Sequence, residues 1–273
     1  MTGAGVADTS SLERIIRQDR LIVAFGLLAV IALSWIYLVT ESAGMRSMLS
    51  QAEMHAAMGM AEMQSWPREL VALFVMWGVM MVGMMLPSAA PLILLILGVY
   101  RRRDDRHTRL NSVLFVSGYL LAWTLFSLAA ASGQIALHRA ALLSAGMAAK
   151  SGVLSAAILI LAGVYQLLPM KNACLAHCRS PLSFLGEHWR EGLAGAVRMG
   201  FLHGLFCVGC CWALMALLFV AGVMNLLWVA AIAAFVLVEK LLRQGLLLGR
   251  IAGVLLIVWG TYLIAASISS TRF

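Results

Sequence analysis

The chain has 273 residues, of which 62% are hydrophobic and only 12% are charged. A soluble domain is typically about half apolar and a quarter charged, so this composition excludes a soluble enzyme, a fibrous protein and a disordered tail. The net charge of +8 follows membrane topology, as shown below, and therefore gives no reason to expect nucleic acid as a partner.

In chain order, seven segments are apolar over nearly the length that a bilayer core about 30 Å thick requires of a helix, roughly 20 residues. They are residues 21–40, 70–99, 110–132, 151–168, 198–220, 224–242 and 249–267. The first exceeds the 7–15 apolar residues of a signal peptide, so we expect it to remain as a span. The second is too long for one straight helix, and Pro87 and Pro91 predict a kink or a separate piece at its end.

The basic residues predict the orientation of these spans. With a cytosolic N-terminus, the 20 Lys and Arg residues divide into 15 inside and 5 outside, which satisfies the positive-inside rule and supports an odd number of spans. We therefore expect an all-α, polytopic transmembrane bundle of about seven spans. Its expected parts are a cytosolic segment (1–20), a first span (21–40), an outside loop rich in Met and His (41–69) and a six-span membrane domain (70–268) with a cytosolic, Cys-containing loop (170–197).

The fifth expected span contains the densest group of reactive side chains, in the stretch HGLFCVGCC. At 100° per residue, four candidate ligands fall within an arc of about 100° on one helix face: His203, Cys207, Cys210 and Cys211. Imidazole and thiolate are soft donors that suit Cu(I) or Zn(II), and a bound cation would offset the cost of thiolate in hydrocarbon. Cysteine also packs as a small hydrophobe, but three cysteines and a histidine on one face favour metal or thiol chemistry.

Methionines recur through the second expected span. Met76, Met80 and Met84 repeat every four residues and form one stripe, while Met81 and Met85 lie on a neighbouring face. Thioether is a neutral soft ligand that can hold Cu(I) without bringing charge into the membrane. Methionine is also a flexible core filler, so the stripe alone favours packing.

The first outside loop is a candidate collector of copper. Between residues 45 and 63 it carries six methionines and one histidine, among them Met54, His55 and Met58. A loop in water has no packing reason for so many methionines, which indicates a low-affinity site for Cu(I) or Cu(II). An interfacial amphipathic helix explains the same residues equally well, because Ala, Glu and Met favour helix.

The expected loop after the fourth span presents Cys174, His177 and Cys178 within five residues. Two thiols with an interposed imidazole are within the range of zinc or copper half-sites. Basic residues nearby favour thiolate, which serves ligation and redox reactions equally. The alternative is a pair of idle cytosolic thiols.

Glu239 and Lys240 lie near the cytosolic end of the sixth expected span. An ionisable residue deep in the membrane would indicate function, but a snorkelling lysine with a neighbouring glutamate is commoner at helix ends, and we expect that here. The sequence shows no paired-carboxylate, nucleophile-elbow or phosphate-loop pattern, so we do not expect hydrolytic or phosphoryl-transfer activity.

Several motifs occur in a fixed order along the chain. They are W-x-x-M-x-x-x-M-M-x-P (77–87), Lys171 with C-L-x-x-C-R-x-P (174–181), H-G-x-x-C-x-G-C-C-W-x-L-M (203–215), G-x-M-N (222–225) and the pair Glu239–Lys240. Together, over roughly residues 66–243, they resemble the predicted metal-binding integral membrane proteins, a bacterial family of unknown function. The resemblance implies a multispan protein of the bacterial inner membrane with a metal site at Cys174, Cys178, His203, Cys207, Cys210 and Cys211.

The leading hypothesis is a copper-handling membrane protein that prefers Cu(I), with zinc as the other candidate ion. Ions would be gathered by the outside loop, passed along the methionine stripe, held in the fifth span and exchanged at Cys174 and Cys178. Expected partners are membrane lipid, the metal ion, and a membrane complex or metallochaperone. Two other functions remain open: a membrane thiol-disulfide oxidoreductase, because Cys207 and Cys210 have Cys-x-x-Cys spacing, and a non-catalytic accessory or assembly subunit in which Met and Cys simply pack.

Overall fold

The computed structural model describes residues 18, 20–44, 66–103, 107–144 and 147–270. Within these ranges the chain is helical and forms no β-strand. Residues 45–65 of the outside loop lie beyond the described residues, and with them the candidate ligands Met54, His55 and Met58, while the two ends of the predicted loop are helical. The helices are Arg20–Gly44, α2 (Trp66–Arg102), α3 (Thr108–Arg139), α4 (Gly152–Leu167), α5 (Pro169–Arg179), α6 (Pro181–His188), α7 (Gly192–Ala216), α8 (Leu218–Ala221), α9 (Leu226–Leu241) and α10 (Gly245–Ser270).

Five of the described helices are long and apolar enough to cross a membrane, or six if the bent pair α4–α5 is one span. This is compatible with a membrane protein, but it is fewer than the seven spans that the sequence predicts. The difference arises because α4 and α9 have 16 residues each. At 1.5 Å per residue each is about 24 Å long, which is short of a hydrocarbon core about 30 Å thick.

The prolines of α2 do not divide it. The helix continues for 37 residues with Pro87 and Pro91 inside it, so the predicted separate piece does not form. The neighbouring residues Leu86, Ala89 and Leu92 are all buried. Packing on both sides of the prolines therefore maintains a helix that proline alone would disfavour.

The predicted loop at 170–197 is largely helical, because it contains α5, α6 and the start of α7. The axis bends by 64° between α4 and α5. Leu168, at the bend, has the extended conformation (φ −69°, ψ 142°) that a following proline imposes on the residue before it. Pro169 then occupies the first turn of α5, where no backbone N–H is needed. The bend turns α5 onto α7.

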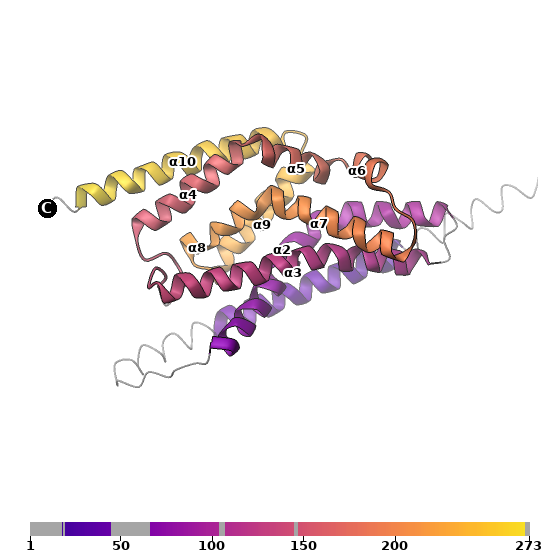
Figure 1. The fold of residues 1–273 in the computed structure, drawn as a ribbon, viewed down its shortest axis with the longest axis horizontal. Coiled ribbons are helices and arrows are strands. Elements are labelled where there is room, and N and C mark those ends of the chain that lie inside the picture. The colour runs from indigo at the N-terminus through magenta and orange to yellow at the C-terminus, as the bar shows by residue number, and fades with distance from the viewer. Residues whose placement is uncertain (1–17, 19, 45–65, 104–106, 145–146, 271–273) are drawn as a thin grey trace, which may run out of the picture.

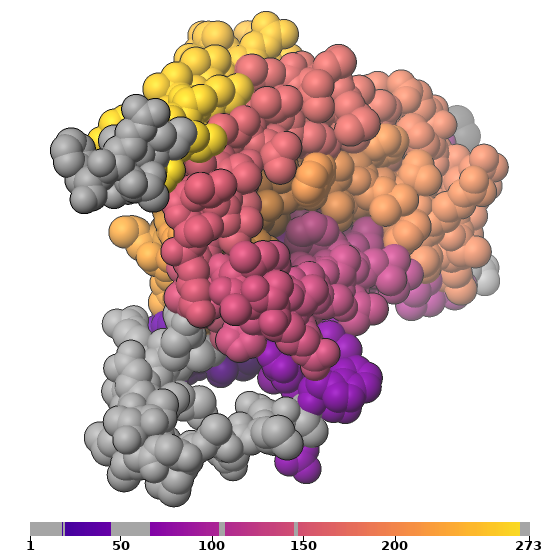
Figure 2. All heavy atoms as spheres, turned by 60° about the vertical axis from the view of Figure 1, so that its left-hand side comes forward, coloured from indigo at the N-terminus to yellow at the C-terminus, as the bar shows by residue number. Residues whose placement is uncertain are grey.

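Three layers of helices make up the molecule. In Figure 1, α4 and α10 lie together along the top, α7 and α9 lie in the middle, and α2 and α3 lie below. Figure 2, turned toward the left-hand end, shows orange α7–α9 residues between the salmon-to-yellow α4–α10 layer and the magenta α3 residues. Glycines bring α3 and α7 close together: a Cβ on Gly200 would overlap the Phe115 backbone, and one on Gly118 would overlap the Val197 backbone. Close approach through small residues is typical of helices packed in membranes.

Two segments rich in basic residues meet at one end of the molecule. Arg103, just after α2, forms an ion pair with Glu191 at 3.1 Å, and Tyr100 lies 5.1 Å from Trp189 between ring centroids. At the opposite end, the backbone N–H of Ala149 donates to the carbonyl of Phe219 at 2.8 Å. This arrangement puts two of the segments that are predicted to be cytosolic, the one that follows α2 and the one between α6 and α7, on one side. Which side faces the cytosol stays a prediction.

Candidate metal centre

All five cysteines of the chain lie on two helices that pack against each other. Cys207, Cys210 and Cys211 on α7 are each 1% exposed, whereas Cys174 and Cys178 on α5 are half-buried. None of the five forms a disulfide. Residues three and four apart share one face of a helix. The helical period therefore puts the two cysteines of α5 on one face of that helix, and the three cysteines of α7 on one face of theirs.

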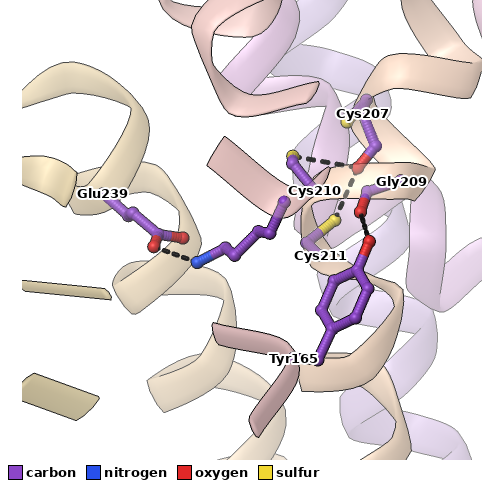
Figure 3. Close-up of polar contacts among 7 residues, drawn as sticks. Tyr165, Cys207, Gly209, Cys210, Cys211 and Glu239 are labelled. Carbon is purple, nitrogen blue, oxygen red and sulfur yellow. Dashed lines mark hydrogen bonds and ion pairs between the residues drawn. The ribbon is translucent and has the colours of Figure 1, made fainter. Parts of the chain in front are cut away.

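The thiols contact one another across the α5–α7 interface. The thiols of Cys210 and Cys211 donate to the carbonyl of Cys207, at 3.1 and 2.9 Å respectively (Figure 3). From α5, the side chain of Cys178 interacts with the side chains of Cys207 and Cys210. Cys174 lies beside Gly209, where an added Cβ would come within 2.9 Å of its sulfur. Glycine at this position of α7 therefore leaves the space that α5 occupies.

A methionine of α2 completes the group of sulfur atoms. The thiol of Cys211 lies 3.8 Å from the thioether of Met85. We call Cys178, Cys207, Cys210, Cys211 and Met85 the thiol site. The predicted stripe of Met76, Met80 and Met84 is buried, but the methionine that meets a thiol comes from the neighbouring face of the same helix.

Lys240 reaches the thiol site from the C-terminal turn of α9. Its ammonium donates to the sulfur of Cys207 at 2.9 Å and to the hydroxyl of Ser88 at 3.0 Å. The hydroxyl of Tyr119 lies 3.1 Å from the same sulfur. Lys240 is only 7% exposed, so the expectation of a snorkelling lysine is wrong. It turns inward because a thiol and a hydroxyl offer acceptors there.

The preceding residue, Glu239, has a different partner. Its carboxylate forms a buried ion pair with Lys171 of α5, and both side chains are 1% exposed (Figure 3). Near the other end of α5, the guanidinium of Arg179 donates to the carbonyls of Leu242 and Arg243 at 2.6 and 2.8 Å. These two attachments fix α5 to the end of α9. They hold Cys174 and Cys178 against α7.

His203 lies beside the thiol site within a group of aromatic rings. It stacks on Tyr119 with 5.8 Å between ring centroids, and Phe184 and Phe115 lie at 5.1 and 6.2 Å. The side chain is buried, and its Nδ1 has no hydrogen-bond partner in the described part of the chain. A buried imidazole nitrogen without a partner is a donor that a metal ion could use. Tyr119 connects it to the thiols, because its hydroxyl contacts Cys207.

His177 points to a different part of the structure. Its Nδ1 lies 2.9 Å from the Ala173 carbonyl and its Nε2 lies 3.6 Å from Glu187, while the ring stacks on Phe206 at 4.3 Å. Both ring nitrogens are therefore directed away from the thiols. Across the residues that the structure describes, no three His, Cys, Asp or Glu side chains are already arranged to hold a metal ion.

The donors that do come together suit a soft ion. The thiol site offers four thiols and a thioether, whereas the nearby carboxylate of Glu239 is paired with Lys171. Hard ions such as Mg²⁺ and Ca²⁺ prefer carboxylates and carbonyls, while thiolate and thioether select Cu(I) and zinc. Sequence reasoning did not assign Met85, Ser88, Tyr119 or Lys240 to this site. The one signal in the sequence for a role at this site was Lys240, an ionisable residue within an expected span.

The chain is similar to a known protein family. No curated protein and no solved structure matches the chain. A family model described as PpoB2, copper chaperone, matches residues 74–263. This range contains all five cysteines, Met85 and Lys240, and it supports the metal-related part of the resemblance found in the sequence. Because the match covers more than half of the chain, the protein belongs to the PpoB2 family of copper chaperones.

Proposed function

We propose that this protein is an integral membrane copper chaperone that binds Cu(I) in the thiol site and hands it to a partner. The observation that carries the proposal is the convergence of four thiols from α5 and α7 with the Met85 thioether of α2. Three of these thiols and the thioether are buried. Soft neutral and anionic sulfur donors in a site that excludes water favour Cu(I) over harder ions.

The hydrogen bonds of the thiols support a site that both binds and releases its ion. Cys210 and Cys211 donate to a backbone carbonyl, so each must turn away from that carbonyl to bind copper. Part of the binding free energy is then used for this rearrangement, which weakens the complex. A chaperone needs such moderate affinity because it must deliver the ion.

The surrounding residues support a route for the ion. Met76, Met80 and Met84 are buried along α2 on the way to Met85. Cys174 lies beside the thiol site at Gly209 and is partly exposed. Under this proposal copper moves from the outside along the methionines and leaves through α5 toward the cytosol. Met54, His55 and Met58 are the proposed collectors, and His203 is a further donor next to the site.

The proposal is tested by Cu(I) titration of the purified, full-length protein in detergent, using a competing chromogenic chelator. We expect about one Cu(I) per chain in the parent protein. Cys178, Cys207, Cys210 and Cys211 are replaced by serine one at a time, and each variant that removes a coordinating thiol is expected to lose most of this binding, because a hydroxyl is a poor soft ligand. Helix content, measured by circular dichroism, is expected to stay unchanged.

Met199→Leu is the matched control. Met199 is buried on the same helix α7, but its sulfur accepts a hydrogen bond from the Arg190 backbone N–H. This variant is expected to bind copper like the parent protein. If all four serine variants keep the parent stoichiometry, the thiol site does not bind copper. Reversible loss of two thiols in a parent protein that binds no copper would instead favour the oxidoreductase.

A further inference from the structure

Lys240, next to the thiol site, carries a buried positive charge without a carboxylate partner among the described residues. Lys240 is buried, and its ammonium contacts a sulfur and a hydroxyl. Among the described residues it forms no ion pair with a carboxylate, since the adjacent Glu239 is paired with Lys171. Among the described residues, the charge of Lys240 is therefore matched in direct contact only by what occupies the thiol site.

The hydrogen bonds distinguish one sulfur from the other two on α7. Lys240 carries donors and no acceptor, so the sulfur of Cys207 accepts from it, as a thiolate does. Cys210 and Cys211 instead act as donors toward the Cys207 carbonyl, as neutral thiols do. One thiolate and one ammonium together leave this part of the protein without net charge.

We infer that Lys240 makes the thiol site select a monovalent ion over a divalent one, an inference that rests on the proposed function. The hydrogen bonds mark only Cys207 as a thiolate, and a buried site resists further negative charge, so the loss of one more thiol proton gives the smallest ion site, with two thiolates. Cu(I) with two thiolates carries one negative charge, which Lys240 neutralises. A divalent ion with the same two thiolates is already neutral, so the ammonium would be left without a counter-charge in a low-dielectric interior.

Zinc also has a greater requirement for ligands. Zn(II) in proteins almost always takes four ligands in structural sites, in a tetrahedral arrangement. Recruiting a third and a fourth thiolate would require two further thiols of the site to lose their protons in a buried environment. Ligand number and local charge therefore both favour Cu(I) over Zn(II). The contribution of charge comes from Lys240, and a single substitution of this residue can remove it.

The test compares ions of similar softness and different charge. Full-length protein in detergent is titrated with Ag(I) and with Cd(II), and separately with Cu(I) and Zn(II). Lys240→Gln and Lys240→Leu both remove the charge. In each variant we expect the preference for the monovalent ion to fall at least tenfold relative to the parent protein. Loss of a buried charge is tolerated in a membrane helix, so both variants are expected to fold.

Two controls separate charge from contact. Lys240→Arg keeps the charge, and Ser88→Ala removes a hydrogen-bond partner of the ammonium while the charge remains; both are expected to keep the parent preference. If Lys240→Gln and Lys240→Leu keep the parent preference while the parent binds Cu(I), the inference fails and the proposed function stands. A shift in Lys240→Arg as large as in Lys240→Gln would also overturn it. Absence of Cu(I) binding in the parent protein would contradict the proposed function itself.

Discussion

Two lysines of this protein are buried near Glu239, and they have different roles. Lys171 on α5 pairs with Glu239, whereas Lys240, the residue that follows this glutamate, turns to Cys207 and Ser88. The first lysine joins two helices through a complete ion pair. The second contacts a sulfur that a metal ion can also bind. The difference teaches that the partner of a buried lysine, rather than its burial, determines what it does.

The largest expected effect distinguishes these two lysines by stability. Lys171→Leu leaves the Glu239 carboxylate buried without its partner, and breaking a buried pair in this way destabilises a protein by about 3–5 kcal/mol. Lys240→Leu is expected to have a much smaller effect, because a thiol becomes neutral at neutral pH once no cation holds it as thiolate. Thermal unfolding of both variants in the same detergent measures the difference.

A double variant serves as the control for that comparison. Lys171→Leu combined with Glu239→Leu removes both charges, so it is expected to recover most of the stability that the single change loses. Equal destabilisation by Lys171→Leu and Lys240→Leu would show that the two lysines have the same role.

An intermediate effect is expected at the methionines of α2. Met85→Leu removes the thioether next to Cys211 and keeps most of its apolar volume. We expect the affinity for Cu(I) to fall about tenfold, or ~1.4 kcal/mol. Met84→Leu, at an equally buried position, is expected to change it less. Competition with a Cu(I) chelator measures both, and the opposite ranking would assign the ligand to the predicted stripe.

The smallest effect is expected where α5, the helix that carries Lys171, packs against α7. In Gly209→Ala the new Cβ would lie 2.9 Å from the sulfur of Cys174, so this flexible side chain must move. We expect a loss of stability of about 1 kcal/mol and a changed labelling rate of Cys174 by a thiol reagent. Cu(I) stoichiometry is expected to stay constant. Gly78→Ala, with nothing within 4 Å of the added Cβ, is the control, and an equal change in labelling there would contradict the explanation.

Apolar runs were sufficient to predict the helical class and the positions of the long helices. They did not predict the bend after α4, although Leu168 and Pro169 carried the signal for it. They also overestimated α9 by three residues, because the helix begins only after its N-cap Asn225 and ends at Leu241, where the backbone turns toward α10. Backbone direction at such a turn depends on contacts with other helices, which a hydropathy profile does not contain.

The candidate site was predictable in composition but not in its partners. Helical period alone put Cys207, Cys210 and Cys211 on one face, and the structure buries all three. The position of Glu239 and Lys240 near a helix end suggested a snorkelling lysine, whereas these successive residues point about 100° apart and find partners on different helices. For the same reason the periodicity of α2 could not tell whether Met84 or Met85 meets Cys211.

The bend at Leu168 has a mechanical consequence. A single extended residue joins α5 to α4, while an ion pair at Lys171 and two hydrogen bonds from Arg179 join α5 to the end of α9. Rotation about the Leu168 backbone changes the angle between α4 and α5 and leaves the attachments to α9 intact. Helix α5 is thus connected to α4 by one residue, and to the end of α9 by an ion pair and two hydrogen bonds. Lys240 lies on α9 and Cys178 on the attached helix α5, so the ammonium and this thiol of the thiol site are held in place by the same contacts.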